Sequence, residues 1–289
     1  MAYVKGTKMK ILVIGGSGFV GWYLAKYMNA IKTSFNEKNG FLKLDITKEN
    51  EVADLFEKIK PDVVINSAAI ADVDLCEKEK DLANIVNGTS VEWLASSASR
   101  INAKFVQIST DYVFDGKIGG YKEEDMPNPI NEYGKSKLLG EQNALKYDSI
   151  ILRIEMPYGI NLAKNKGVFF ESVIRNLKDN KSFNAAIDQI ISPTYVEDIA
   201  PAIENLVTSD SKGIFHLASK ENLSRYEFSK LIAEVFNFDT SNINGVKLDD
   251  FKLTAKRPKK TFLNTEKISK LYKINSIRKN LIEIKNKYL

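Results

Sequence analysis

A glycine-rich turn near the N-terminus constrains the fold more than any other stretch of this sequence. Residues 10–14 form a short apolar, β-branched run that is typical of a buried strand, and apolar residues recur at helical spacing from Phe19 onward. Between them, residues 15–21 read GGSGFVG. A strand, a glycine turn and a helix in this order favour a site where phosphates meet the free N–H groups of a helix N-terminus. A plain glycine turn is the alternative that this context disfavours.

Strand-like and helical segments alternate along the next hundred residues. Apolar runs suited to strands occupy residues 31–35, 41–44, 62–65 and 104–108, and segments with helical apolar spacing separate them. This alternation predicts an α/β fold with a doubly wound parallel sheet, in which ligands bind at the carboxyl ends of the strands. All the polar and glycine-rich loops described below are expected at that edge.

The chain has 289 residues, enough for one large domain and a smaller one. We predict an NAD(P)-binding Rossmann domain at residues 1–160. Residues 161–289 are expected to be mostly a smaller, C-terminal substrate-binding domain, with the chain returning to the sheet near 190–220.

Cysteine and histidine are each present once, as Cys76 and His216. A single cysteine excludes an internal disulfide and fits a reducing, cytoplasmic location. A Cys/His metal site is excluded as well, and we predict no bound metal. Because His216 lies in an apolar strand-like segment, residues 213–218, a core or edge position is expected for it rather than catalysis.

Charge and hydropathy limit the partners of the chain. The net charge of +5 is a small excess on a surface with 79 charged side chains, and no basic stripe alternates with aromatic residues. This disfavours a nucleic-acid groove. No apolar run approaches the roughly 18 residues of a membrane span, and no apolar run of signal-peptide length precedes the glycine turn. We therefore expect neither nucleic acid nor membrane as a partner.

A hydroxyl-tipped strand is followed by a tyrosine and a lysine one helical turn apart. Residues 109–116 read STDYVFDG, and Tyr133 and Lys137 then share one helix face at positions i and i+4. A nearby ammonium group favours the phenolate and lowers the tyrosine pKa, which suits proton transfer. Ser109 or Thr110 would hold a substrate oxygen beside the phenol. An ordinary buried aromatic is the alternative for Tyr133.

The tyrosine–lysine spacing occurs a second time, at Tyr226 and Lys230. There we predict only a helix, capped by Ser224 and packed through its apolar residues. The hydroxyl-tipped strand and the upstream glycine turn distinguish the first pair from the second.

Together these stretches resemble the dTDP-4-dehydrorhamnose reductases, within the extended short-chain dehydrogenases/reductases. The matching stretches span most of the chain and are residues 15–21, 61–69, 73–74, 109–116, 133–141, 192–194, 257–258 and 263–267. The resemblance implies hydride delivery from NADP(H), or alternatively NAD(H), to the C4 ketone of a dTDP-4-keto-6-deoxy-hexose, giving dTDP-L-rhamnose.

The resemblance also assigns roles to residues. Tyr133 would give a proton to O4, Lys137 would tune Tyr133 and bind the cofactor ribose, and Thr110 would hold the ketone. Asp111 and Met156 would line the sugar pocket. The cofactor site would comprise Gly15, Gly18, Phe19, Val20, Gly21, Asn36, Asp45, Ile46, Ala68, Ala69, Ile70, Ala71, Tyr133 and Lys137.

Three positions in the sequence have alternative interpretations. Asp45 would accept from the adenine amino group or begin the following helix as its cap. Residues 36–38 carry both an acid and a base, which leaves the choice between NAD and NADP open. Similarly, Arg257 would either reach a nucleotide diphosphate or lie on the surface as an unremarkable side chain.

The chain departs from the family pattern in two places. Residues 153–156 read RIEM where the family commonly has RTSW, which removes a flat aromatic wall and adds the Glu155 carboxylate. This departure leaves the exact sugar open. Tyr23 stands where some members carry a carboxylate for a metal-bridged dimer, so no such metal is expected.

Other readings remain beside the reductase. The first is a non-catalytic NADP-binding regulatory subunit like that of methionine adenosyltransferase. The second is another nucleotide-sugar reductase or epimerase. A nucleotide-sugar substrate and a homodimer are the expected partners.

Overall fold

Seven parallel strands form the central sheet of the computed structural model, which describes residues 3–4, 7–164 and 167–288. Each pair of neighbouring strands runs parallel, so the predicted doubly wound α/β fold is confirmed. In spatial order, the strands are β11 (Gly213–Leu217), β8 (Ile150–Ile154), β7 (Lys104–Thr110), β6 (Val63–Asn66), β3 (Ile11–Ile14), β4 (Ile31–Ser34) and β5 (Leu42–Lys43).

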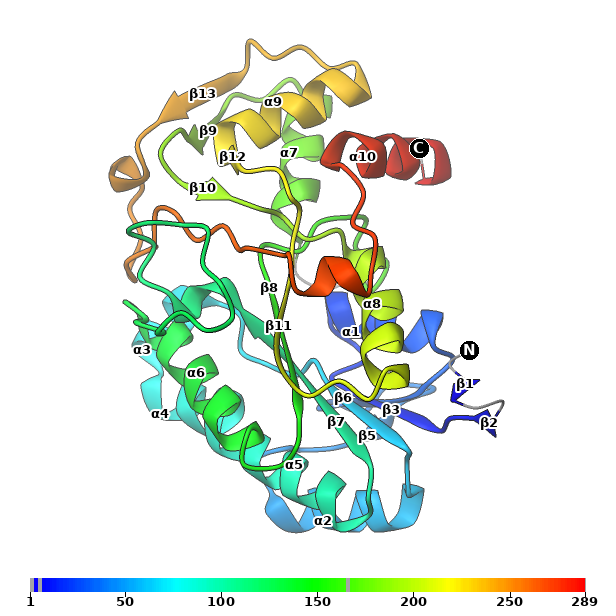
Figure 1. The fold of residues 1–289 in the computed structure, drawn as a ribbon. Helices are drawn as coiled ribbons and strands as arrows, with labels where there is room; N and C mark the ends of the chain where they lie inside the picture. The colour runs from blue at the N-terminus through cyan, green and yellow to red at the C-terminus, as the bar shows by residue number, and fades with distance from the viewer. Residues whose placement is uncertain (1–2, 5–6, 165–166, 289) are drawn as a thin grey trace.

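Both faces of this sheet are buried beneath helices (Figure 1). Along β3, Ile11 and Val13 join one apolar cluster, whereas Leu12 and Ile14 join another on the opposite face. This two-sided burial explains why the strand sequences are continuously apolar rather than alternating. One face is covered by α1 (Phe19–Tyr27) and α8 (Val196–Thr208). The other is covered by α2 (Glu49–Ile59), α5 (Ser90–Arg100) and α6 (Glu132–Ala144).

The strand order reverses between β3 and β6. The chain runs outward from β3 through β4 to β5, and then crosses to β6 on the other side of β3 before continuing through β7 to β8. A reversal of this kind opens a crevice at the carboxyl ends of the two strands. The glycine turn after β3 and residues 67–70 after β6 meet at this point.

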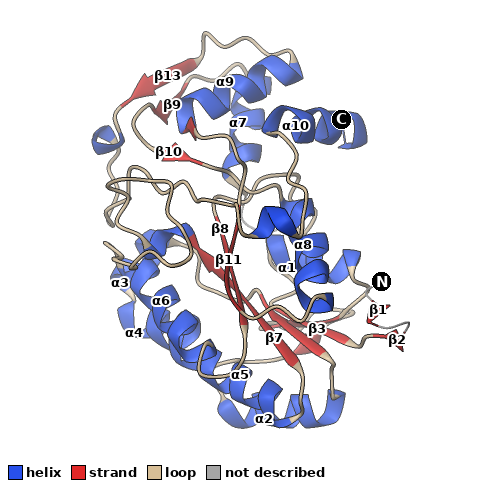
Figure 2. Cartoon of the chain, viewed as in Figure 1, coloured by secondary structure: helices blue, strands red, loops and turns tan. Residues whose placement is uncertain are grey.

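A smaller lobe lies beyond the carboxyl ends of β7 and β8 (Figure 2). It has its own apolar cluster, built around Phe170, Phe228 and Leu281. Two short strand pairs flank this core, one parallel and one antiparallel. The elements of the lobe are α7 (Phe169–Lys178), α9 (Arg225–Phe236), α10 (Ile277–Tyr288), β9 (Phe183–Ala186), β13 (Ile243–Val246), β10 (Ile190–Ile191) and β12 (Leu223–Ser224).

Shorter elements complete the described chain. Two short helices and a π-turn lead from β6 into α5, and an N-terminal strand pair precedes β3. They are α3 (Val73–Lys78), α4 (Lys80–Asn84), η1 (Ile85–Thr89), β1 (Tyr3–Val4), β2 (Thr7–Lys8), η2 (Asp111–Val113), η3 (Leu248–Asp250) and η4 (Ile268–Lys270).

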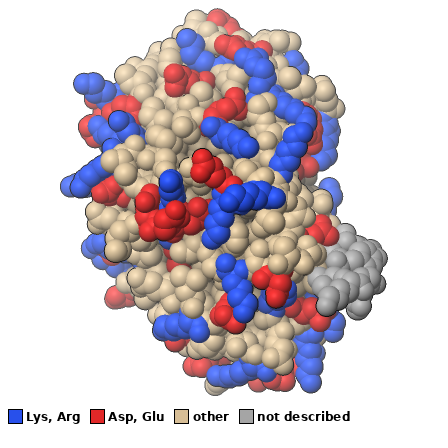
Figure 3. Space-filling model, viewed as in Figure 1, with Lys and Arg blue, Asp and Glu red and all other residues tan. Residues whose placement is uncertain are grey.

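Basic and acidic side chains are interspersed on the face of the molecule shown in Figure 3. Within the described residues, no helix combines the length and the apolar character needed to cross a membrane.

Candidate functional site

The glycine turn and the end of β6 form a closely packed cradle. Gly15 has a φ of +74°, and a Cβ on it would lie 2.7 Å from the backbone of Ala68. A Cβ on Gly21 would lie 2.2 Å from the carbonyl oxygen of Gly15. Gly18 precedes the first residue of α1 and has no side chain to cap it. The free N–H groups of this helix N-terminus therefore face the turn, as a pyrophosphate requires.

A cavity of about 470 Å³ opens beside this cradle. The predicted cofactor residues Gly15, Gly18, Asp45, Ile46, Ala68, Ala69 and Ile70 all line it. The sequence did not single out the remaining lining residues, which are Ile14, Ser17, Thr33, Phe35, Leu44, Thr47, Ser67, Leu82 and Val86. The size, the glycine cradle and the helix N-terminus fit a dinucleotide.

Three predicted cofactor residues line neither this cavity nor the second cavity described below. Asn36 is exposed, and Gly21 serves the packing of α1 on the turn. Phe19 packs edge-to-face on Tyr23, with 5.9 Å between ring centroids. Asp45 accepts hydrogen bonds from the backbone N and the hydroxyl of Thr47, while the cap position of α2 belongs to Lys48. The capping alternative for Asp45 is therefore wrong.

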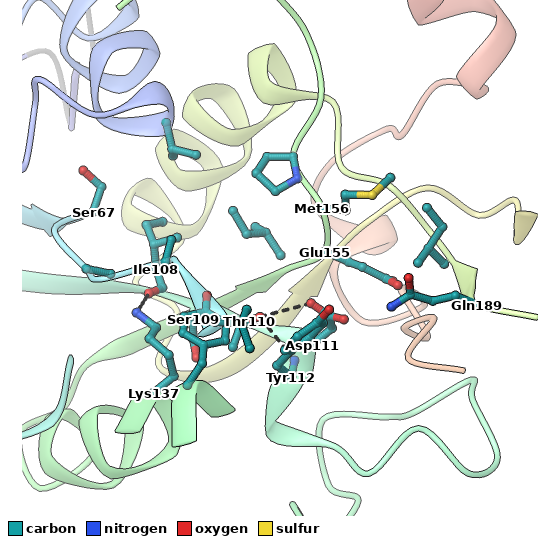
Figure 4. Close-up of a pocket in the computed structure, with 18 of the residues that line it drawn as sticks. Ser67, Ile108, Ser109, Thr110, Asp111, Tyr112, Lys137, Glu155, Met156 and Gln189 are labelled. Atoms are coloured by element: carbon teal, nitrogen blue, oxygen red, sulfur yellow. Dashed lines mark hydrogen bonds between the residues drawn. The ribbon is translucent and has the colours of Figure 1, made fainter. Parts of the chain in front are cut away.

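A second cavity, of about 260 Å³, adjoins the first and shares Ser67 and Ala69 with it. It contains every predicted catalytic and sugar-pocket residue: Thr110, Asp111, Tyr133, Lys137 and Met156. Val20 and Ala71, predicted for the cofactor, also line it. In Figure 4, Ser67 and Lys137 lie on one side of this cavity, and Glu155 and Gln189 lie on the opposite side.

The start of α6 carries the tyrosine and the lysine to the cavity. Asn131 caps the helix by accepting from the backbone N of Gly134 at 2.9 Å. A Cβ on Gly134 would lie 2.1 Å from the carbonyl oxygen of Tyr112, so the glycine lets the helix approach the end of β7. Lys137 Nζ donates to the carbonyl oxygen of Ile108 at 2.8 Å. Helix and strand thus hold both reactive side chains at one sheet edge.

Burial controls the ionisation of both residues. It lowers the pKa of Lys137 to about 8, against an opposing effect of the Glu141 carboxylate. It also raises the pKa of Tyr133, with the Thr110 hydroxyl acting in the opposite direction. The net shift of the tyrosine pKa is therefore opposite to the lowering that the sequence predicted, because desolvation of the phenolate dominates. Tyr133 is a protonated phenol at neutral pH, which is the form that gives a proton.

A buried ion pair lies beside the end of β7 and holds it to α6. Arg153 donates to both carboxylate oxygens of Glu141, at 2.9 and 2.6 Å, and each side chain is only 1% exposed. The Ser109 hydroxyl donates to the same carboxylate. Arg153 Nη1 lies 3.2 Å from His216 Nε2.

His216 is fully buried in β11, as predicted. Because arginine only donates, His216 Nε2 must accept, and Nδ1–H is left to donate to the carbonyl oxygens of Tyr121 and Asn264. Burial, reinforced by Arg153, lowers the pKa of this imidazole to about 3. His216 is therefore a neutral structural residue.

Two carboxyl groups line the opposite side of the cavity. Glu155 accepts from the hydroxyls of Ser192 at 2.6 Å and Thr261 at 3.0 Å. Asp111 Oδ1 accepts from the Thr110 hydroxyl at 3.0 Å, but its Oδ2 is buried without a hydrogen-bond partner. Desolvation raises the pKa of Asp111 to about 6. Desolvation, with the charge of Asp111, raises that of Glu155 to about 8.

Arg225 is the lining residue that sequence reasoning missed most clearly. It is the first residue of α9, directly after Ser224. Its place next to this predicted helix cap is the only clue to its role that the sequence contains. By contrast, Arg257 donates to Asp74 at 3.1 Å and to the carbonyl oxygen of Ala255 at 2.8 Å. Arg257, for which the sequence left a diphosphate contact and a surface position open, is therefore a mostly buried partner of Asp74.

The second tyrosine–lysine pair takes no part in either cavity. Lys230 Nζ lies 5.1 Å above the ring of Tyr226, and Ser224 and Glu227 form a capping box at the start of the same helix. The prediction of a capped, packed helix there is confirmed.

Two further details bear on the family pattern. The Tyr23 hydroxyl donates to the carbonyl oxygen of Ile160 at 2.7 Å. In the part of the chain that the structure describes, no group of three or more His, Cys, Asp or Glu side chains is arranged to hold a metal.

Comparison with known proteins agrees with this geometry. A dTDP-4-dehydrorhamnose reductase of Aggregatibacter actinomycetemcomitans is 33% identical over 285 residues, covering 92% of this chain and 94% of that protein. The methionine adenosyltransferase 2 subunit beta of Pongo abelii is 31% identical over 278 residues, covering 91% and 82% respectively. The crystal structure of the Bacillus anthracis dTDP-4-dehydrorhamnose reductase in complex with NADP has a TM-score of 0.89 at 30% identity, covering 97% of this chain and 99% of that one.

The family described as the RmlD substrate binding domain matches residues 9–288, which is nearly the whole chain. This extent, together with the identities above, confirms the resemblance carried by the sequence motifs. The chain belongs to the RmlD family, the family of the dTDP-4-dehydrorhamnose reductases.

Proposed function

We propose that this protein is an NAD(P)H-dependent reductase of the C4 ketone of a dTDP-4-keto-6-deoxy-hexose, giving dTDP-L-rhamnose. One observation carries the proposal: Thr110, Tyr133 and Lys137 meet in a cavity that adjoins a dinucleotide-sized one. The relatives named dTDP-4-dehydrorhamnose reductase support the choice of substrate.

The three residues divide the work at the ketone. A bound nicotinamide dinucleotide would supply the hydride. Tyr133, kept protonated by burial, gives its proton to O4, while the Thr110 hydroxyl hydrogen-bonds the same oxygen. Lys137, anchored on the carbonyl oxygen of Ile108, holds a ribose hydroxyl and stabilises the phenolate that forms. Asp111 and Met156 contact the sugar.

NADP(H) is the proposed cofactor, with NAD(H) as the alternative. Glu37, the acid nearest the end of β4, forms an ion pair with Lys43 at 3.3 Å. Lys32 and Lys38 both place their ammonium groups over the ring of Phe41, at 4.6 and 5.1 Å. Around the end of β4, the three lysines outnumber Glu37, which favours a 2′-phosphate over a bare ribose. The NADP complex of the Bacillus anthracis relative supports this choice.

The remaining proposals concern context. The division near residue 160, a cytoplasmic location, a homodimer and the absence of a nucleic-acid partner stay predictions. The regulatory-subunit alternative draws support from the methionine adenosyltransferase relative. The convergence of all three reactive groups on one cavity favours the enzyme.

Loss of NADPH absorbance tests the proposal. Purified protein is mixed with NADPH, or NADH, and dTDP-4-keto-6-deoxy-L-lyxo-hexose. Tyr133→Phe should reduce kcat by roughly a hundred- to ten-thousand-fold because the proton donor is lost. Tyr226→Phe is the matched control, since it removes the hydroxyl of the other tyrosine–lysine pair, and it should leave the rate unchanged.

The outcomes separate the alternatives. Tight NADPH binding without oxidation of NADPH or NADH would exclude the reductase and favour a regulatory subunit. Conversion of a sugar nucleotide without net cofactor oxidation would indicate an epimerase. Equal losses in the two tyrosine variants would remove Tyr133 from the mechanism.

A further inference from the structure

Arg225 extends the cavity at the end opposite to Lys137. Its backbone N donates to the carbonyl oxygen of Gln189 at 3.1 Å, and Gln189 lies across the cavity from Lys137 (Figure 4). Its guanidinium carbon lies 4.9 Å from the ring centre of Phe169. The backbone bond and the aromatic ring fix the direction of the side chain, so the guanidinium is oriented before any ligand arrives.

Among the residues that the structure describes, the guanidinium of Arg225 has no carboxylate partner, although it lines a cavity. Its Nε is buried without a hydrogen-bond partner, and within residues 3–4, 7–164 and 167–288 the group forms no ion pair. Arg153, Arg257 and Arg278, in contrast, each pair with a carboxylate. Arg225 is partly exposed as a residue, but its buried Nε donor without an acceptor is costly, and such a donor in a cavity-lining side chain points to a ligand that supplies the acceptor.

Asp111, which lines the same cavity, has an unpartnered acceptor. Asp111 Oδ2 is buried without a partner, and the charge of Arg225 lowers the pKa of this carboxyl without forming an ion pair with it. The Arg225 guanidinium and the Asp111 carboxyl are therefore close enough for their charges to interact, but they form no ion pair with each other. A ligand with a hydroxyl at Asp111 and an anionic oxygen at Arg225 would satisfy both.

We propose that Arg225 is the anion-binding residue of this cavity and takes a phosphate oxygen of the nucleoside diphosphate of the substrate. The identity of the ligand rests on the proposed reductase function. Thr110 and Tyr133 fix the position of the ketone, which leaves the far end for the diphosphate. Guanidinium groups bind phosphate oxygens through two parallel hydrogen bonds, and the N-terminus of α9 adds a favourable dipole. Arg257, the sequence candidate for this role, is already committed to Asp74.

Binding of dTDP, measured by calorimetry with saturating NADP⁺, tests the proposal without requiring turnover. Arg225→Gln should weaken dTDP binding by about 10- to 100-fold. Arg225→Lys should weaken it less, because lysine keeps the positive charge but lacks the two parallel N–H donors of a guanidinium. Arg278→Gln is the matched control, since it removes an arginine that pairs with Glu234 on the surface, and it should bind dTDP like wild type. Thymidine, which has no phosphate, should bind wild type and Arg225→Gln equally.

Three results would overturn the assignment: no dTDP binding by wild type, wild-type affinity in Arg225→Gln, or an equal loss for thymidine. Unchanged affinity for NADP⁺ shows that each variant is folded. If wild type binds dTDP but does not oxidise NADPH with the keto-sugar, the reductase function fails. The dTDP comparison then still decides the role of Arg225.

Discussion

Two clusters of buried charge lie two residues apart along the chain at the end of β8, and they differ in how completely they are paired. Around Arg153, the guanidinium, the Glu141 carboxylate and the His216 ring all have partners within the protein. Around Glu155, two carboxyl groups and the Arg225 guanidinium line a cavity, and Asp111 Oδ2 and Arg225 Nε have no hydrogen-bond partner. We call the fully paired group around Arg153 the closed cluster and the incompletely paired group around Glu155 the open cluster.

The difference separates support from recognition. A fully paired buried network fixes one geometry for the strand end and the helix that carry Ser109 and Lys137. An incompletely paired cluster lowers the stability of the protein on its own, and it becomes favourable when a ligand supplies the missing partners. Charges in the closed cluster should therefore control the stability of the protein. Those in the open cluster should control how stability depends on pH and how tightly the substrate binds.

The largest expected effect is in the closed cluster. Glu141→Ala leaves the Arg153 cation buried without a carboxylate, and we expect unfolding free energy to fall by about 3–5 kcal/mol. Urea denaturation monitored by circular dichroism measures this loss. Lys212→Ala is the control, because the Lys212–Asp148 pair is exposed to solvent and should contribute little to stability.

A double variant sharpens the same point. Replacing both partners with apolar residues, as in Glu141→Leu with Arg153→Met, should cost less stability than Glu141→Ala alone, because no charge is left unpaired. A loss in Glu141→Ala no larger than in Lys212→Ala would contradict the view that the closed cluster is a structural support.

The next effect concerns the pH dependence of the open cluster. In the folded protein the pKa of Glu155 rises from its ordinary 4.5 to about 8, so the folded state keeps a proton that the unfolded state has released. Stability therefore falls as pH rises from about 5 to 8. Glu155→Gln, which cannot ionise, should lose less stability over this range, by at least about 1 kcal/mol.

Urea midpoints measured between pH 5 and 8 check this prediction. In the Glu155→Gln variant, stability should still fall with rising pH, but less steeply, because the pKa of Asp111 is also raised, to about 6. The charge of Arg225 opposes that shift. Parallel curves for wild type and Glu155→Gln would show that Glu155 does not hold a proton in the folded state.

The smallest effect is at the helix that presents Arg225. The Ser224 hydroxyl accepts from the backbone N of Glu227 at 3.1 Å, and Ser224→Ala should reduce unfolding free energy by about 1 kcal/mol. Ser241→Ala, which removes a hydroxyl that donates to Asp239 in an exposed turn, is the control and should change stability by less than about 0.5 kcal/mol. An unchanged unfolding free energy in Ser224→Ala would show that the capping box does not stabilise α9.

Much of the site was predictable because it is local in sequence. The glycine turn, the end of β7 and the tyrosine–lysine pair each lie within one strand–loop–helix unit, and spacing within such a unit fixes the geometry. Asn36 does not line the cavity and stays a prediction, because the loop after β4 is exposed and no periodic pattern fixes where its side chains point. The tyrosine pKa was misjudged because spacing shows a neighbouring charge but not the burial that outweighs it.

The sequence by itself determined the parallel sheet, the crevice beside β3 and the pair Tyr133 and Lys137, because apolar periodicity and glycine placement act over short distances. Only the tertiary structure decided that Arg257 is paired and Arg225 is not, and that Glu155 faces Asp111 across from Lys137. Those outcomes depend on segments more than 30 residues apart meeting in space. Pairing and desolvation exist only once that packing has formed.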